Sequence, residues 1–193
     1  MNMCLWPEVP RPSQTVPCNS CELKAHSPRL VWGEGNPLAR AWILLDNPGA
    51  RESGDHTPWV CGTRQTLYDE VAKAGFGAQG LYLTFVLRRR PRRAYAKEAE
   101  RHQCLQNLHR GMNEHPPRLL LCLGDIALRA FLGDAEASVR QTRETWQQSR
   151  GIWLTASYHP LATRRRPTPL LPLFAQDLHF FFQGFQSLAN PAD

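Results

Sequence analysis

Four short apolar runs mark the expected strands of this chain. They cover residues 41–47, 81–87, 118–123 and 152–157. Continuous apolar runs of this length are typical of strands that are buried on both faces. Helical patterns lie between and after them, at residues 64–74, 97–113 and 125–132 and beyond Pro172. Strands and helices are therefore expected to alternate.

This alternation predicts an α/β fold, because a helix is the usual connection between two parallel strands. We expect a three-layer sandwich in which a central, mainly parallel, four-stranded sheet is flanked by helices. With 193 residues, of which 42% are hydrophobic, the chain can bury one sizeable core. We therefore expect a single domain over residues 1–193. Residues 1–30, rich in Pro, Ser and Cys, are expected to form an irregular segment.

Two missing patterns narrow the class of protein. No apolar run reaches the roughly 18 residues that span a membrane. Residues 1–16 contain three prolines and lack the apolar stretch of a secretory signal. We expect a soluble, cytoplasmic monomer with no membrane contact. In a reducing compartment its six cysteines would not form disulfides, and a Cys-x-x-Cys pair there is more often a metal or redox site.

The positive charge of the chain is concentrated in two clusters, within a formal net charge of +6. One cluster consists of Arg88, Arg89, Arg90, Arg92 and Arg93, and the other of Arg164, Arg165 and Arg166. Each follows a predicted strand, and ligands of open parallel sheets bind outside the carboxyl ends of the strands. Clusters of this kind commonly bind phosphates, so we expect a polyanionic partner.

Four short motifs, in a fixed order, resemble those of a known family. Residues 31–39 read Val-Trp-Gly-Glu-Gly-Asn-Pro-Leu-Ala, and a strand and Asn47-Pro48-Gly49 follow. Pro58-Trp59-Val60 comes next, and Tyr158-His159-Pro160 follows a later strand. This order resembles the iron-sulfur, family-four uracil-DNA glycosylases over most of residues 18–180. The Asn-Pro-Gly turn itself is more similar to that of the mismatch-specific and single-strand-selective relatives.

The resemblance implies an enzyme that flips a base out of DNA and hydrolyses its N-glycosidic bond, leaving an abasic site. Such hydrolysis builds positive charge on the sugar and negative charge on the base, so it needs an oriented water and a donor. By resemblance, Asn47 orients the water and His159 donates to the base. Asp46 replaces a family Glu and either assists catalysis or caps the following turn. The alternative for His159 is that it only forms a hydrogen bond within the loop that it begins, which is what a histidine outside such a motif would most often do.

The resemblance also assigns the residues that contact the base. Trp59 stands where the family has the aromatic residue that stacks on the extruded base. The alternative is that Trp59 belongs to the core. Phe85, Pro48 and Gly49 complete the expected base-binding set.

The expected DNA contacts come from the two arginine clusters and from the residue after Tyr158-His159-Pro160. Leu161 would fill the hole that the flipped base leaves in the duplex. The phosphate contacts are assigned to Arg164, Arg165, Arg166, Arg88 and Arg90. A solvated basic loop is the alternative for the second cluster.

The segment at residues 84–91, Thr-Phe-Val-Leu-Arg-Arg-Arg-Pro, departs from the family's T-N-V-V-K-C-R-P. The family Asn that reads uracil is here Phe85. A phenyl ring cannot make the base-edge hydrogen bonds that provide discrimination of about 10⁴–10⁵. We therefore expect a modified or damaged pyrimidine as substrate, not uracil alone, and a modified cytosine of phage DNA would imply defence. A conventional repair uracil-DNA glycosylase and an inactive DNA-binding module are the alternatives.

The same segment lacks one cysteine of the family's cluster. Cys18, Cys21 and Cys104 match three ligands of a [4Fe-4S] cluster, but Arg89 replaces the fourth. Cys4, a histidine or an exogenous ligand would have to complete it. Zinc with His26 or His102 is one alternative, and a metal-free segment is another. Cys61 and Cys122 are expected to pack in the core.

Overall fold

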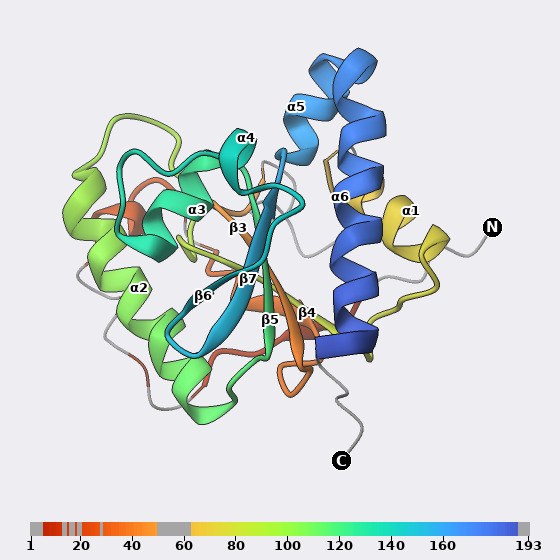
Figure 1. Cartoon of the computed structure of the whole chain (residues 1–193). Coiled ribbons are helices and arrows are strands. Elements are labelled where there is room, and N and C mark those ends of the chain that lie inside the picture. Colours follow the sequence, from red (N-terminus) through yellow and green to blue (C-terminus); the bar gives the residue numbers. More distant parts are fainter. Residues whose placement is uncertain are drawn as a thin grey trace.

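The computed structural model describes residues 6–12, 15, 18, 21–27, 29–49 and 63–188. Its centre is a sheet with the strand order β1-β2-β4-β3-β5-β7-β6 (Figure 1). Four inner strands run parallel: β3 (Ala41–Leu45), β4 (Leu81–Phe85), β5 (Leu119–Leu123) and β7 (Ile152–Ser157). They lie within the four predicted apolar runs, so the α/β class and the mainly parallel sheet are confirmed.

The prediction of four strands is wrong, because the described residues form a sheet of seven. Three short antiparallel strands extend it: β1 (Glu8–Val9), β2 (Gly33–Gly35) and β6 (Gln147–Ser149). Their sequences, such as Gly-Glu-Gly and Gln-Gln-Ser, have no apolar pattern from which they could be predicted. Very short, polar strands of this kind are typical near sheet edges, where they limit pairing with other chains.

Helices cover both faces of the sheet (Figure 1). On one face lie α1 (Thr63–Lys73) and α6 (Pro167–Leu188), and on the other α2 (Lys97–Glu114) and α3 (Asp125–Leu132). The shorter helices are η1 (Glu22–Lys24), α4 (Val139–Thr142) and α5 (Pro160–Arg165). The three-layer arrangement is therefore confirmed. None of the described helices is long and apolar enough to cross a membrane.

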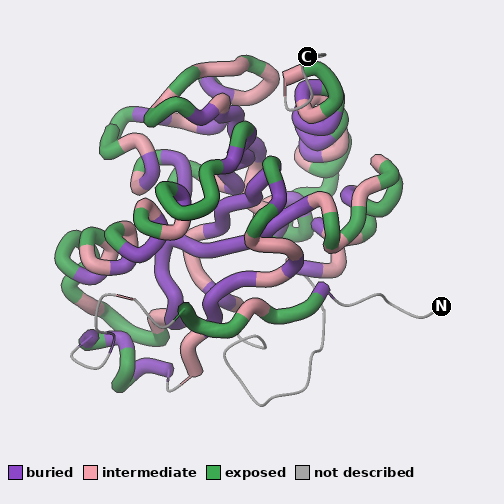
Figure 2. The backbone as a smooth tube through the Cα atoms, turned by 90° about the horizontal axis from the view of Figure 1, so that it is seen from below, coloured by how far each residue is buried: buried purple, intermediate pink, exposed green. Residues whose placement is uncertain are grey.

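The alternation of side chains along β3 divides the core between the two faces. Ile43 and Leu45 pack in the cluster that contains Phe181 of α6. Trp42 and Leu44 pack on the other side, in the cluster that contains residues of α2 and α3. Successive residues of a strand point to opposite faces, and all five residues of β3 are buried. Figure 2 shows the same contrast between buried inner strands and exposed outer helix surfaces.

The parallel register brings several strand ends to one edge of the sheet. Leu45 at the end of β3 pairs with Phe85 at the end of β4. Leu123 at the end of β5 pairs with Ser157 at the end of β7. The segments that follow these strands therefore emerge together, as ligand sites of parallel sheets require.

Candidate active site

The turn after β3 is fixed by its own side chains and by β4. The backbone N–H of Asn47 donates to Asp46 Oδ1 at 2.8 Å, and Asn47 Nδ2 donates to the Pro48 carbonyl at 2.9 Å. The Asp46 carbonyl accepts from the Leu87 N–H at 2.9 Å. The Asp46 carboxylate thus accepts a hydrogen bond within the turn that it begins. Pro48 is buried, whereas Asp46 and Asn47 are partly exposed.

His159 faces this turn from the other side of the site. Its Nε2 lies 3.3 Å from Asp46 Oδ1. Its Nδ1 accepts the backbone N–H of Leu161 at 3.1 Å, at the start of α5. A backbone N–H can only donate, so Nδ1 is the acceptor and the ring proton lies on Nε2. The structure therefore brings Asp46, Asn47 and His159 together, with a donor N–H at the centre of the site.

Gly124, directly after β5, makes room for the histidine. It has a φ of 93°, a conformation that L side chains rarely adopt. A Cβ atom added there would lie 3.1 Å from His159 Cβ. The Gly124 N–H also donates to the Ser157 carbonyl at 2.8 Å. A glycine at this position allows the two strand ends and the His159 ring to pack closely.

A cavity of about 450 Å³ opens beside Asp46 and His159. Leu161, which is 40% exposed, lies on its wall. Its other lining residues include Asp125, Ile126, Arg165 and Arg166. Apolar side chains can contact bases, and arginines can bind phosphates, so the composition of this wall is compatible with a DNA strand. Arg164 is exposed at the same helix, α5.

The first arginine cluster is divided between the interior and the surface. Arg88 is 2% exposed, and its guanidinium donates to Thr84 Oγ1 and stacks over the Trp32 ring at 4.6 Å. Burial lowers the pKa of Arg88. The prediction that Arg88 contacts phosphate is therefore wrong, because its guanidinium is enclosed in the fold and cannot reach a phosphate at the surface. Arg90 is partly exposed.

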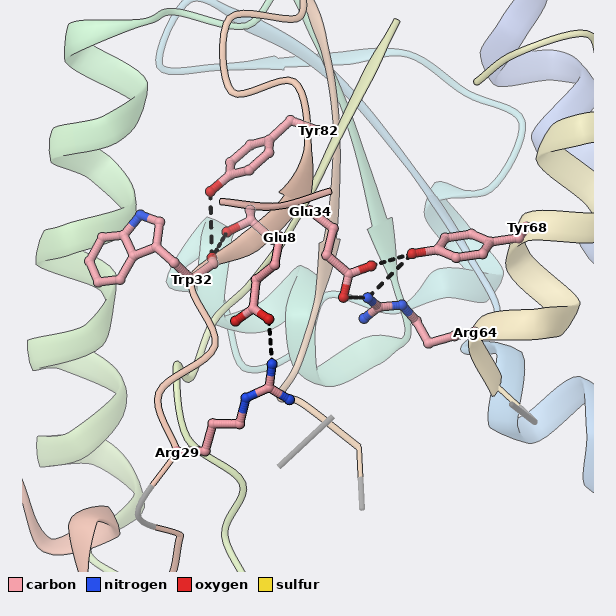
Figure 3. A network of polar contacts seen from close by, with 8 residues as sticks. Glu8, Arg29, Trp32, Glu34, Arg64, Tyr68 and Tyr82 are labelled. Atoms are coloured by element: carbon pink, nitrogen blue, oxygen red, sulfur yellow. Dashed lines mark hydrogen bonds and ion pairs between the residues drawn. The ribbon is translucent and has the colours of Figure 1, made fainter. Parts of the chain in front are cut away.

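Phe85 also lies inside the fold, at 1% exposure. The Arg64 guanidinium lies 5.5 Å from the centre of its ring. Arg64 forms an ion pair with Glu34, which also accepts a hydrogen bond from the Tyr68 hydroxyl (Figure 3). The side chain at the family's base-reading position is thus a core residue here. The charged neighbours Arg64 and Glu34 were not predicted, although Glu34 belongs to the matched motif at residues 31–39.

The structure describes only some of the other predicted base-binding residues. Trp59 lies outside the described residues, as do Cys4 and Cys61. Gly49 is the last described residue of the turn that begins at Asp46, and it is partly exposed.

The three predicted metal-ligand cysteines lie in one buried region. Cys21 and Cys104 belong to one apolar cluster with Leu87. Burial raises the pKa of Cys104, and Cys18 raises it further. The Cys21 thiol donates to Glu100 Oε2 at 2.8 Å. Burial and this bond raise the pKa of Cys21 to about 12.

Among the described residues, this arrangement does not supply a complete set of four cysteine ligands. Within the part of the chain that the structure describes, no group of three or more His, Cys, Asp or Glu side chains is arranged to hold a metal ion. Arg89, at the position of the missing ligand, donates from Nη1 to the Ser27 carbonyl at 2.9 Å. Nor is zinc supported: His26 accepts a bond from the Arg92 N–H, and His102 is exposed beside Gln106. Cys122 is fully buried, as expected of a packing residue.

Known proteins are similar to this chain over most of its length. The sequence profile of the uracil DNA glycosylase superfamily matches residues 32–179. The chain is 29% identical over 180 residues to the type-4 uracil-DNA glycosylase of Pyrobaculum aerophilum, covering 86% of this chain and 89% of that protein. It is 27% identical over 164 residues to the type-4 uracil-DNA glycosylase of Archaeoglobus fulgidus, covering 80% and 81% respectively.

The profile includes the turn after β3 and the Tyr158-His159-Pro160 segment after β7. The two segments meet through His159 and Asp46 in the structure. The similarity to family-four enzymes predicted from these motifs is confirmed. The chain therefore belongs to the uracil-DNA glycosylase superfamily, a family of DNA N-glycosylases.

Proposed function

We propose that the protein excises uracil from DNA by hydrolysing its N-glycosidic bond, and that it also accepts other altered pyrimidines. The observation that carries this proposal is the meeting of Asp46, Asn47 and His159 at the carboxyl edge of the sheet, with 3.3 Å between His159 Nε2 and Asp46 Oδ1. The relatives named for uracil excision support the first part of the proposal.

His159 acts on the departing base. Its ring proton lies on Nε2, since Nδ1 accepts the Leu161 N–H. As the glycosidic bond breaks, negative charge develops on the base, and an N–H donated to a base oxygen stabilises that charge. Removing one such preorganised donor typically lowers the rate by about 10²–10³. The base oxygen takes the place of Asp46 as the acceptor.

Asn47 and Asp46 act on the sugar. Asn47 Nδ2 donates to the Pro48 carbonyl, so the amide oxygen is the atom directed at a water proton. An oriented water then attacks the anomeric carbon as the base departs. The Asp46 carboxylate supplies negative charge next to the cationic sugar of the transition state. The bond that it accepts from the Asn47 N–H keeps that charge in a fixed place.

The cavity beside His159 receives the DNA strand. Arg165 and Arg166 on its wall, with Arg164 on the same helix, bind phosphates. Leu161 is exposed next to His159 and enters the space that the extruded nucleotide leaves in the duplex. Trp59, which lies outside the described residues, is proposed to stack on the base.

The broader substrate range follows from Phe85. A buried phenyl ring offers no hydrogen bond to N3 or O4 of uracil, so side-chain reading of the base edge at this position is lost. Stacking and leaving-group stabilisation do not require that reading. The names of the relatives give no support for a modified cytosine of phage DNA as the substrate.

The test is an excision assay on matched oligonucleotides that carry one uracil, 5-hydroxymethyluracil, 5-hydroxymethylcytosine or thymine. Abasic sites are counted after alkaline cleavage, with enzyme in excess over DNA. We expect release of uracil, and release of 5-hydroxymethyluracil at a rate within about 100-fold of it, because a stacking site distinguishes bases weakly. Release of no base would overturn the enzymatic proposal, and strict preference for uracil would overturn the broader range.

A further inference from the structure

An ion pair between a buried carboxylate and a partly exposed arginine lies beneath the catalytic edge of the sheet. Asp177, in the middle of α6, is 1% exposed, and its Oδ1 lies 2.7 Å from Arg143 Nη2. Arg143, just after α4, also donates to the Leu173 carbonyl of α6 at 3.4 Å. A buried carboxylate is unfavourable unless it is paired and hydrogen-bonded. The burial of Asp177 therefore suggests a role for this pair. Neither residue lines the cavity beside His159.

Asp177 has a second partner at the end of β7. Ser157 is fully buried, and its Oγ donates to Asp177 Oδ2 at 2.6 Å. Burial raises the pKa of Asp177, whereas the hydrogen bonds from Ser157 and Arg143 lower it. A hydrogen bond from a hydroxyl to a carboxylate is about twice as strong as one between neutral groups. The side chain of Ser157 is thus fixed to α6.

The backbone of Ser157 is fixed as well. Its carbonyl accepts the Gly124 N–H at 2.8 Å, and its pairing with Leu123 is the last register pair between β7 and β5. Only Tyr158 separates Ser157 from His159. Gly124 in turn lies against the His159 side chain. Ser157 is therefore the last fixed point of the strand that delivers His159 to the site.

We infer that Asp177 is a positioning residue for His159 and acts through Ser157, an inference that rests on the role proposed for His159 above. The carboxylate fixes the direction in which the chain leaves β7, and with it the direction of His159 Nε2. Asp177 itself does not touch the substrate. Misplacement of a catalytic group by about 1 Å can lower the rate by about 10²-fold. A change at Asp177 or Ser157 should therefore slow base release far more than it weakens DNA binding.

The test compares Ser157→Ala with Thr155→Val. Thr155 is the matched control, because it is buried two residues earlier on the same face of β7 and its Oγ1 donates to the Thr142 carbonyl at 3.3 Å, not to Asp177. We expect Ser157→Ala to lower the single-turnover rate by about 10- to 100-fold. Its affinity for DNA with a non-hydrolysable nucleotide should stay within about twofold, as expected for a transition-state effect. Thr155→Val should keep its rate within about threefold at a similar melting temperature.

A second readout does not depend on activity. The ¹⁵N shifts of the His159 ring, assigned with His159→Ala, should report a proton on Nε2 in the wild type and in Thr155→Val. In Ser157→Ala and Asp177→Asn they should show averaging between the two tautomers. Asp177→Asn leaves the partly exposed Arg143 beside a neutral amide. If that variant does not fold, Ser157→Ala still tests the inference.

The outcomes separate this inference from the proposed function. A Ser157→Ala protein with the rate and the His159 signals of Thr155→Val would overturn the positioning role. A wild-type protein that releases no base would overturn the proposed function, and the His159 signals would still decide whether Asp177 and Ser157 set the orientation of the ring.

Discussion

The carboxyl edge of the sheet has two halves that differ in the exposure of their polar side chains. One half consists of the ends of β3 and β7, and the other of the end of β4. After β3 and β7, the side chains of Asp46 and His159 bond to each other and remain 25% and 26% exposed. After β4, Arg88 and Arg89 turn inward and are 2% and 8% exposed. Both halves follow strand ends, where parallel sheets place their ligand sites. Asp46 and His159 therefore remain available to a substrate, whereas Arg88 and Arg89 are enclosed and only the later arginines of their cluster reach the surface.

The cause of the difference is the chain that covers each half. The exit of β4 is covered by the segment before β2: the Val31 N–H donates to the Arg88 carbonyl at 2.9 Å, and the Ser27 carbonyl accepts from Arg89. The exit of β7 continues directly into α5, which places His159 at the mouth of the cavity. A position directly after a strand therefore predicts where a functional side chain can lie. Whether that side chain can reach a substrate depends on the segment that covers the strand end.

The largest effect is expected in the exposed half. Asn47→Ala and His159→Ala should each lower the rate of base release by about 10²–10³, because each removes an interaction that stabilises the transition state. DNA affinity, measured by fluorescence anisotropy, should change by less than about threefold. The control is His179→Ala, which removes an exposed imidazole of α6 that bonds to Gln183. Full activity in either site variant would remove the basis of the contrast between the two halves.

The next effect concerns stability in the buried half. Phe85→Asn should lower the free energy of unfolding by about 3 kcal/mol, since it removes a core ring and buries an amide. Phe85→Leu, which keeps an apolar side chain of similar volume, should lower it by less than about 1.5 kcal/mol. Urea denaturation measures both. A stable Phe85→Asn protein with an altered choice of base would show instead that position 85 contacts the base.

A smaller effect should separate the two arginine clusters. Changing Arg164, Arg165 and Arg166 together to Ala should weaken DNA binding by about 10- to 100-fold. The slope of the logarithm of the binding constant against the logarithm of the salt concentration should become shallower by about one for each phosphate that the variant no longer neutralises. Arg88→Met should leave that salt dependence unchanged, because the Arg88 guanidinium is enclosed by Trp32 and Thr84. Binding titrations at several salt concentrations provide the measurement. Equal slopes in the triple variant and the wild type would contradict the footprint on α5.

The inner strands and long helices could be predicted because apolar periodicity determines them. The ends of α1, α2 and α3 were predicted within one residue. The strands β1, β2 and β6 could not be predicted, since pairing with a neighbour, not an apolar pattern, makes them strands. In the site, the resemblance indicated Asp46, Asn47 and His159, which the structure brings close together and whose roles stay predictions.

The sequence could not show that Arg88 and Phe85 turn inward, because their burial depends on contacts distant in the chain. Arg88 donates to the Trp32 carbonyl, 56 positions earlier. Phe85 packs under Arg64, and Arg64 is paired with Glu34 of the motif at residues 31–39. That motif is therefore informative about the family, and in this chain its Glu34 is paired with Arg64 beside the buried Phe85 ring.

The smallest effect concerns how the N-terminal segment is attached to the buried half. Glu100 accepts hydrogen bonds from the Cys21 thiol at 2.8 Å and from the Glu22 N–H at 3.0 Å. Glu100→Gln replaces one acceptor oxygen by a donor, so it should lower the free energy of unfolding by about 1 kcal/mol. It should also increase the rate at which Cys21 is alkylated, measured by mass spectrometry. Glu98→Gln, exposed in the same first turn of α2, is the control and should change neither quantity.

The same preparation tests the state of Cys21. A thiol that donates to Glu100 keeps its proton, whereas a cysteine bound to iron is a deprotonated ligand. Iron and sulfide are therefore measured in wild-type protein purified without oxygen. A bound cluster that protects Cys21 from alkylation, together with no effect of Glu100→Gln, would show that metal ligation attaches this segment. If no cluster is found and Cys21 is alkylated faster in Glu100→Gln than in the wild type, the Glu100 carboxylate attaches this segment. That result would fit the replacement of the fourth cysteine by Arg89.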